Sequence, residues 1–225
     1  MKHTILYIAT LFLLAACQQE ELPLGEQALG YLSLSEVSME ASDVQLISTR
    51  AEEDEPLIVE LLQGKEVKYS KIYTDSMTLS CAPGSYTLQI RSESYGTDES
   101  AAKYYYWHGP VEVKEGETTP IEEPIEVPMV NFGVTFSWPE DLKGFTKIKF
   151  NVEYGSTSKE IQTGETVYFD ISDGKIISYS LSAKNEDMDP VFTKGSYGDE
   201  ENETLKAGTI YTVSYKLETQ TLEIK

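Results

Sequence analysis

Short runs in which apolar and polar residues alternate fill most of the chain after residue 28, and they constrain its fold more than any other feature. In the run from Ser85 to Arg91, Tyr86, Leu88 and Ile90 are separated by polar residues. Successive side chains of a β-strand point to opposite faces, so this pattern predicts a strand with one buried face. No strong helical pattern follows the first sixteen residues. The sequence therefore predicts an all-β fold.

The expected strands fall into two groups, because prolines at positions 120, 124 and 128 would confine a strand through this stretch to a sheet edge. The strands are short and polar on one face, which argues against a parallel sheet. We expect two tandem β-sandwich domains, immunoglobulin-like or transthyretin-like, at residues 28–127 and 128–225. A linker is expected at 40–56, and a long acidic surface loop at 185–206. The expected strands are 28–39, 57–62, 67–73, 77–80, 85–91, 111–114, 118–127, 130–138, 146–154, 165–171, 176–183, 210–217 and 221–224.

The first seventeen residues have the features of an export signal. Lys2 precedes an apolar run, Ile5 to Leu14, that is too short to span a bilayer, and two alanines then precede Cys17. Leu-Ala-Ala-Cys at this place resembles the lipobox of bacterial lipoproteins. The resemblance implies a signal peptide at 1–16, acyl chains such as palmitate on Cys17, and a tether at 17–27. The alternative is an ordinary signal peptide with a chance cysteine.

A polar and acidic run, Gln18 to Glu21, comes directly after Cys17. It is similar to the surface-export signal of Bacteroidota lipoproteins, which implies an outer-membrane lipoprotein that is anchored at the cell surface. The alternative is that the run is only a flexible spacer. If the protein is a lipoprotein, the membrane is its partner through the lipid on Cys17.

The charge of the chain is strongly negative. Its 18 Lys and Arg oppose 38 Asp and Glu, giving a net charge of −20. Nucleic acids and anionic lipids bind clustered cations, so this composition argues against them as partners. The chain has two cysteines, and lipidation of Cys17 would leave only Cys81. No disulfide is then expected, and Cys81 is interpreted as a small buried apolar residue.

The residue types that usually perform catalysis or bind metals are scarce. His3 would leave with the signal, so His108 would be the only histidine of the exported chain. No recognisable Ser or Cys nucleophile motif surrounds it, and there is no glycine-rich phosphate loop. The acidic residues between 187 and 201 lack the spacing of an EF-hand. We expect a non-enzymatic protein with no metal and no cofactor.

Two short stretches are candidates for binding or modification. Tyr104, Tyr105, Tyr106 and Trp107 form an aromatic run beside a loop, and aromatic faces stack on the apolar faces of sugars. Alternation within a strand would, however, bury about half of this run in a core. Asp75-Ser76-Met77 resembles the O-glycosylation sequon of Bacteroidota, with Ser76 as the acceptor. Such a three-residue motif also arises often by chance.

Four stretches together resemble a domain-of-unknown-function family of Bacteroidota lipoproteins. They are Gly30-Tyr-Leu-Ser-Leu-Ser, Thr49-Arg50-Ala51 before an acidic run, Pro83-Gly84-Ser85-Tyr86-Thr87-Leu88, and Tyr104-Tyr105-Tyr106 followed by Val111-Glu-Val-Lys-Glu-Gly-Glu-Thr-Thr. The resemblance covers residues 28 to about 140. More distantly, the layout is similar to that of the fimbrillins, subunits of type V pili that are exported as lipoproteins with two β-sandwich domains.

The fimbrillin resemblance implies a function in adhesion or pilus assembly, with other pilus subunits as partners. In fimbrillins an arginine-specific protease cuts the N-terminal linker, a strand leaves, and a donor strand from the next subunit replaces it. Here the cut would follow Arg50, before Ala51, and an edge strand at 29–39 would leave with Leu32, Leu34 and Val37. Thr221 to Lys225 is a possible donor, although it pairs more simply with its own neighbour. The alternatives are an uncut lipid-anchored protein and a glycan-binding surface lipoprotein that uses Tyr104 to Trp107.

Overall fold

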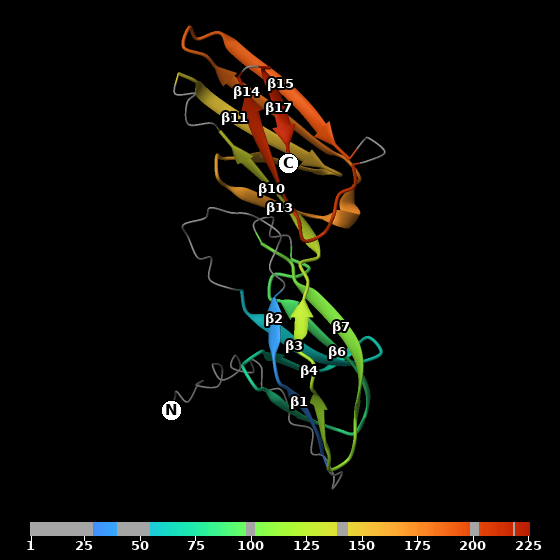
Figure 1. The fold of residues 1–225 in the computed structure, drawn as a ribbon. Helices are drawn as coiled ribbons and strands as arrows, with labels where there is room; N and C mark the ends of the chain where they lie inside the picture. The colour runs from blue at the N-terminus through green and yellow to red at the C-terminus, as the bar shows by residue number, and fades with distance from the viewer. Residues whose placement is uncertain (1–28, 40–54, 98–101, 139–143, 199–202, 218) are drawn as a thin grey trace, which may run out of the picture.

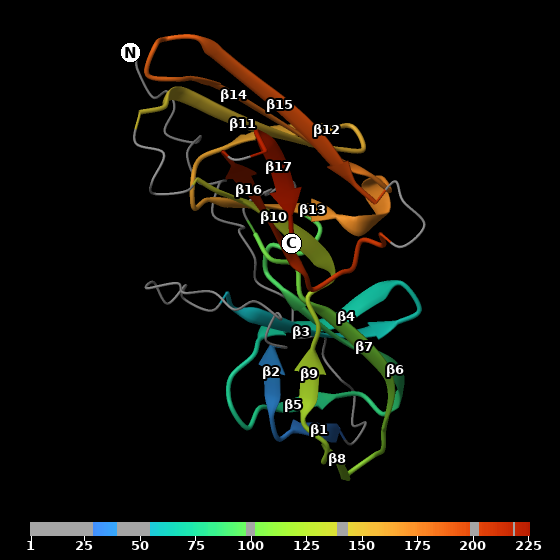
Figure 2. The ribbon, with the colours of Figure 1, turned by 45° about the horizontal axis from the view of Figure 1, so that its top comes forward.

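Strands make up almost all the regular structure of this protein. The computed structural model describes residues 29–39, 55–97, 102–138, 144–198, 203–217 and 219–225. Within them lie seventeen strands and a single short 3-10 helix, which confirms the predicted all-β fold. Two β-rich domains are stacked end to end, nine strands in one and eight in the other (Figures 1 and 2). None of the described helical segments is long and apolar enough to span a bilayer.

The N-terminal domain is a sandwich of two facing sheets. One sheet is antiparallel, and the other contains the first strand of the chain and is accompanied by a parallel pair of short strands. Its strands are β1 (Gly30–Leu34), β2 (Val37–Met39), β3 (Leu57–Gln63), β4 (Glu66–Ile72), β5 (Thr78–Cys81), β6 (Gly84–Ser92), β7 (Tyr106–Val113), β8 (Thr118–Ile121) and β9 (Ile125–Val127). The antiparallel sheet has the order β4-β3-β6-β7, the second has the order β5-β1-β8, and β2 pairs with β9.

The C-terminal domain is a sandwich of two sheets with four strands each. Its elements are β10 (Asn131–Ser137), β11 (Thr146–Tyr154), β12 (Thr157–Ile161), β13 (Thr166–Asp170), the 3-10 helix η1 (Ile171–Asp173), β14 (Ile177–Lys184), β15 (Pro190–Tyr197), β16 (Ile210–Lys216) and β17 (Thr221–Ile224). The sheet orders are β13-β10-β16-β17 and β12-β11-β14-β15. β10 pairs antiparallel with β13 and parallel with β16, just as β1 pairs with β5 and β8. The first strand of each domain therefore occupies the same place in its sheet.

A separate hydrophobic core fills the space between the sheets of each domain. In β6 the alternation seen in the sequence holds, because Tyr86, Leu88 and Ile90 all face the first core. The second core is rich in aromatic rings, and Phe136 stacks on Phe150 with their centroids 4.2 Å apart. Each domain therefore has the one-sided strands that its alternating sequence predicts.

Tyr154 fixes the end of β11 in the second core. Its ring is 1% exposed, and its hydroxyl lies 2.7 Å from the carbonyl oxygens of both Ile171 and Gly174. Burial raises the pKa of the Tyr154 hydroxyl, and the hydrogen bond to Gly174 opposes this rise. The hydroxyl therefore ties β11 to the 3-10 helix region.

Replacing Tyr154 with phenylalanine should lower the free energy of unfolding of the C-terminal domain by about 1–3 kcal/mol, since two carbonyl groups lose their donor inside the protein. Chemical denaturation followed by far-UV circular dichroism would measure the change. Tyr31→Phe, at a hydroxyl on a residue that is 40% exposed, is the control and should be close to neutral. Equal stability of the Tyr154→Phe variant and the parent would contradict this role.

Asn131 joins the two domains at the start of β10. Its side chain is buried, accepts a hydrogen bond from the Tyr104 amide at 2.9 Å, and donates one to the Ala102 carbonyl at 2.9 Å. Tyr168 and Ile210 of the C-terminal domain pack with the first core. The contact between the domains therefore includes both hydrogen bonds and apolar packing.

The structure corrects two predictions about loops and strands. Residues 185–206 are not one long loop, because β15 lies within them and pairs along its whole length with β14. An edge strand of this kind needs few apolar residues, and its side chains are exposed or half-buried. The expected strand at 118–127 is divided into β8 and β9, with Glu122 to Pro124 between them. A proline at position 124 cannot donate a backbone hydrogen bond, so the ladder is interrupted there.

Candidate functional site

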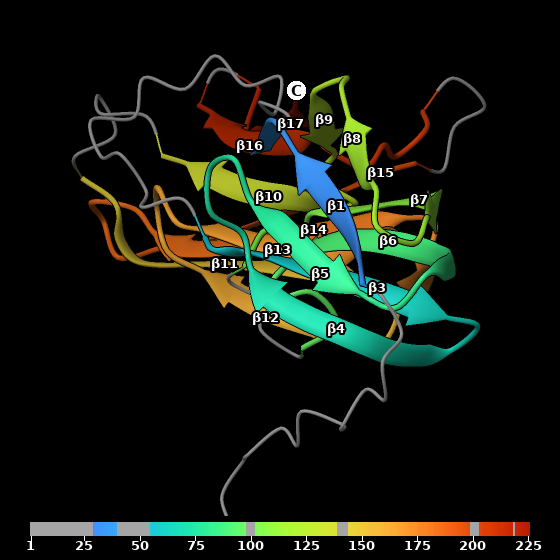
Figure 3. The ribbon, with the colours of Figure 1, turned by 90° about the horizontal axis from the view of Figure 1, so that it is seen from below.

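β1 is the middle strand of its sheet, so the prediction of an edge strand at 29–39 is wrong for residues 30–34, whereas β2 at 37–39 pairs with β9 alone. Leu32 lies opposite Leu79 of the antiparallel β5 and opposite Thr119 of the parallel β8. Viewed from the N-terminal domain, β1 runs between these two strands (Figure 3). The alternation of a strand shows which face is buried but not which distant strands flank it. Removal of β1 would therefore leave unpaired backbone groups on two strands rather than on one.

The inward side chains of β1 belong to the centre of the first core. Leu32 is 0% exposed and Leu34 is 1% exposed, whereas Tyr31, which precedes them, faces outward. Gly30 packs closely against the connection between β7 and β8. A Cβ added at Gly30 would lie 2.3 Å from the Lys114 carbonyl oxygen. β1 is thus held by tight backbone packing as well as by its two leucines.

The segment after β1 remains bound to the domain as far as residue 39. The Val37 amide donates a hydrogen bond to the Tyr73 hydroxyl at 3.1 Å, and the Ser35 hydroxyl donates to the Ile121 carbonyl at 2.9 Å. Val37 and Met39 pack against the first core. The proposed cleavage residues Arg50 and Ala51, and the lipidation residue Cys17, lie outside the described residues. The chain is described again from Glu55, just before β3.

The aromatic run is divided between the two faces of its sheet. Tyr105 and Trp107 point inward and contact the first core, whereas Tyr106 and His108 alternate with them on the outer face. Tyr104 precedes β7, and its hydroxyl donates a hydrogen bond to the Thr97 carbonyl. Only part of the predicted ligand-binding run is therefore available at the surface.

A buried ion pair lies in the same sheet. Glu60 of β3 is 6% exposed, and its carboxylate accepts hydrogen bonds from Arg91 Nε at 3.1 Å and from Arg91 Nη2 at 3.0 Å. Gln89 and Ser70 donate to the same carboxylate at 2.9 and 3.2 Å. Tyr106 donates to Gln89 at 3.3 Å, so the network reaches the aromatic run. Sequence reasoning missed this network, because Glu60 lies within an otherwise apolar run.

Tyr95 covers the exposed part of the aromatic run. Its ring stacks on Tyr106 with centroids 4.7 Å apart and meets Tyr104 edge-on at 6.1 Å. Burial raises the pKa of the Tyr95 hydroxyl, Tyr106 and Asp170 raise it further, and Arg91 lowers it. Tyr95, Tyr104 and Tyr106 thus contact one another in a tyrosine cluster, in which Tyr95 covers one face of Tyr106.

The structure also shows the surroundings of Ser76 and Cys81. Ser76 is exposed in the turn between β4 and β5 and adopts a left-handed backbone conformation with φ of 58°. Cys81, in β5, is half-buried against the first core, and burial raises the pKa of its thiol. Ser76 is thus accessible, and Cys81 is a packing residue with little thiolate at neutral pH.

The C-terminal segment considered as a donor strand is engaged within its own domain. β17 pairs antiparallel with β16, and Leu222 contributes to the second core.

Within the described part of the chain, no group of three or more His, Cys, Asp or Glu side chains is placed to hold a metal ion.

Comparison with known families extends the sequence resemblance. Residues 28–225 match the model of a domain of unknown function, DUF4493. The chain belongs to this family. The match includes both β-sandwich domains of this DUF4493 protein, and it confirms the resemblance to a domain-of-unknown-function family. No curated protein matches the chain.

Solved structures that align with this chain include fimbrial proteins. A fimbrilin (FimA) from Porphyromonas gingivalis aligns with a TM-score of 0.50 and 6% identity, covering 87% of this chain and 97% of the fimbrilin. The fimbrial anchor protein Mfa2 of the same organism aligns with a TM-score of 0.43 and 12% identity, covering 88% of this chain and 95% of Mfa2. At this identity the likeness to FimA shows a shared fold, and the fimbrillin-like architecture is confirmed at that level.

Proposed function

We propose that this DUF4493 protein is a fimbrillin-like surface lipoprotein that acts in adhesion or pilus assembly without catalysing a reaction. Cys17 carries the lipid that anchors it to the outer membrane. Cleavage after Arg50 releases the N-terminal segment, and a donor strand from another subunit takes its place. The partners are therefore the membrane, before cleavage, and other pilus subunits.

The central position of β1 is the observation that carries this proposal. A strand with neighbours on both sides and with two fully buried leucines leaves a deep, two-edged groove when it is removed. Such a groove binds a new strand through main-chain hydrogen bonds and side-chain pockets. Because β17 is paired with β16 in its own domain, the incoming strand is expected from a separate chain.

The position of the arginines also supports the cleavage site. The chain has two arginines, Arg50 and Arg91. Arg91 lies in β6 and is bound to Glu60, so it is a poor protease site. Arg50 lies between β2 and β3, where a cut would separate β1 and β2 from the remainder of the domain.

Mass spectrometry and N-terminal sequencing of the protein from its native outer membrane would test this proposal. A mature chain that begins at Ala51 without lipid is the expected result. An Arg50→Ala variant should keep acylated Cys17 at its N-terminus, and a Cys17→Ser variant should lack the lipid. A wild-type chain that still begins at acylated Cys17 would rule out the polymerising form and leave an anchoring subunit or a glycan-binding lipoprotein.

Glycan binding by the aromatic run finds less support. Tyr105 and Trp107 face the core, and one face of Tyr106 is covered by Tyr95.

Modification of Ser76 is compatible with its exposure in a turn. Peptide mapping of the native protein would detect a sugar on Ser76, and an unmodified peptide would remove this site from the proposal.

A further inference from the structure

A row of serines forms the middle of an outward sheet face in the C-terminal domain. Ser178, Ser180 and Ser182 alternate with buried residues along β14. Longer side chains flank them on β11 and β15. We call this surface, with the flanking residues, the serine face. The register gives three cross-strand rows, Glu153–Ser178–Ser196, Asn151–Ser180–Lys194 and Lys149–Ser182–Phe192.

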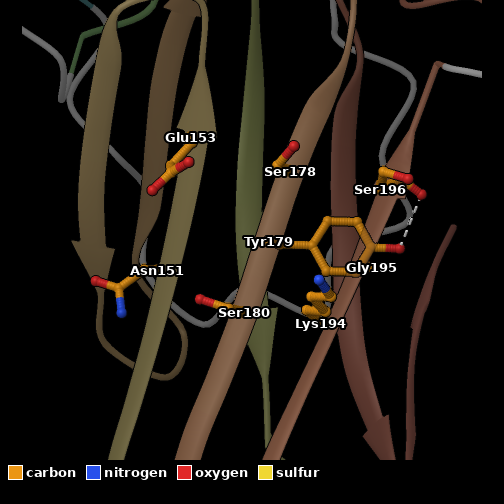
Figure 4. A pocket seen from close by; sticks show the side chains of 8 residues that line it. All are labelled: Asn151, Glu153, Ser178, Tyr179, Ser180, Lys194, Gly195 and Ser196. Atoms are coloured by element: carbon orange, nitrogen blue, oxygen red, sulfur yellow. Dashed lines mark hydrogen bonds between the residues drawn. The ribbon is translucent and has the colours of Figure 1, made fainter.

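The first two rows enclose a depression. It has a volume of about 460 Å³ and is lined by Asn151, Glu153, Ser178, Ser180, Lys194 and Ser196. The depression exists because short serines lie between longer side chains, which are Glu153 and Asn151 on β11 and Lys194 on β15. Figure 4 shows Asn151 and Glu153 on one flank, and Lys194 and Ser196 on the other.

Tyr179 and Gly195 keep the two strands under this depression in place. Tyr179 is 5% exposed, and an added Cβ on Gly195 would lie 2.4 Å from its ring. The Tyr179 hydroxyl donates to the Ser196 carbonyl at 3.3 Å, as drawn in Figure 4. The floor of the depression is therefore already ordered in the free protein, which lowers the conformational entropy that is lost on binding.

Three polar side chains around the depression are not used by the fold. Among the described residues, the side chains of Asn151, Ser180 and Lys194 make no hydrogen bond or ion pair. They offer an amide that both donates and accepts, a hydroxyl that does the same, and an ammonium donor. Glu153 adds an acceptor whose charge opposes that of Lys194, so the depression favours a neutral polar ligand over an ion.

A large exposed aromatic ring stands at the next row of the same face. Phe192 is 68% exposed, more than any other large apolar residue that is described. It lies two residues from Lys194 on β15, and side chains at this spacing share a face about 7 Å apart. An aromatic ring beside several free hydrogen-bonding groups is complementary to a sugar, which has apolar C–H faces and polar hydroxyls.

We propose that the serine face binds a neutral oligosaccharide. Phe192 stacks against one sugar ring, and Asn151, Ser180, Lys194 and Glu153 hydrogen-bond the hydroxyls of the neighbouring ring in the depression. The inference does not rest on cleavage after Arg50 or on strand exchange. An adhesive subunit would thereby carry its glycan site on the domain that does not contain β1.

An array of neutral plant, mucin and bacterial oligosaccharides, probed with the purified full chain, tests the proposal. Binding to at least one of them is expected, and titration calorimetry would then give the Kd for that oligosaccharide. Phe192→Ala should weaken binding at least tenfold, and Ser180→Phe should do the same by filling the depression. Ile72→Ala is the matched control, since Ile72 is 55% exposed on β4 of the other domain. It should leave the Kd unchanged.

Three results would overturn the proposal. They are the absence of binding across the array, binding that survives both Phe192→Ala and Ser180→Phe, and binding that Tyr106→Ala removes while Phe192→Ala does not. The last result would place the sugar at the tyrosine cluster. Circular dichroism of each variant would show whether the fold is kept, and Asn151→Ala provides a second, milder substitution in the depression, for which a weaker affinity is again expected.

Discussion

Replacing Leu32 with alanine is expected to lower the free energy of unfolding of the N-terminal domain by about 2–5 kcal/mol. Leu32 is 0% exposed and lies opposite Leu79 in the middle of its sheet. The truncated side chain leaves a cavity that neighbours on both sides cannot readily close, because the backbones of β5 and β8 hold them apart. Urea denaturation measures the loss.

The two tryptophans allow this loss to be assigned to a domain. Trp107 packs against the first core and Trp138 against the second. In a Trp138→Phe background, fluorescence reports on Trp107 alone, and its transition should move to lower urea in the Leu32→Ala variant. The matched control is Tyr31→Ala on the same strand, where the side chain is 40% exposed and the cost should be clearly smaller. Equal losses for the two variants would mean that β1 is not the centre of the first core.

This expected loss bears directly on strand exchange. A chain that has lost β1 lacks the apolar side chains of Leu32 and Leu34 as well as hydrogen bonds to two strands. The driving force for a donor strand is therefore both apolar burial and backbone pairing, and a suitable donor must present apolar residues two apart. Domain stability and the affinity for a donor strand thus depend on the same groove.

Local pattern in the sequence predicts the strands that bury one face well. β6 is the clearest case, because Tyr86, Leu88 and Ile90 must all point to the core once the segment is extended. The same reasoning predicts that about half of Tyr104 to Trp107 turns inward, as Tyr105 and Trp107 do. In these segments the period of the strand alone determines which side chains are buried.

Features that depend on partners distant in the sequence could not be predicted in this way. The pairing of β1 with both β5 and β8 arises from contacts across more than forty residues. β15 buries little and therefore has no apolar signal, although it supplies Phe192 and Lys194 to the serine face. Glu60 is covered only because β4, β6 and their side chains lie beside it. Alternation therefore predicts which face of a strand is buried, whereas the topology of the sheet determines which strands lie beside it.

Replacing Arg91 with methionine is expected to lower the free energy of unfolding by about 3–5 kcal/mol, comparable to the Leu32 substitution. Arg91 makes two hydrogen bonds to the Glu60 carboxylate, whose side chain is 7% exposed. Without the guanidinium, a charged group remains in a site that water hardly reaches. Gln89 and Ser70 still donate to it, but neither neutralises its charge. The same Trp107 fluorescence measurement would follow this change.

A double variant separates the burial of an unpaired charge from the loss of a favourable contact. In Glu60→Met/Arg91→Met no charge remains, and much of the stability should return because apolar side chains of similar size replace the pair. Lys68→Met, at an exposed pair with Glu66, is the control and should change stability by less than about 1 kcal/mol. If the double variant instead stays as far below the parent protein as Arg91→Met does, the loss does not come from an unpaired buried charge, and the pair contributes net stability relative to apolar side chains.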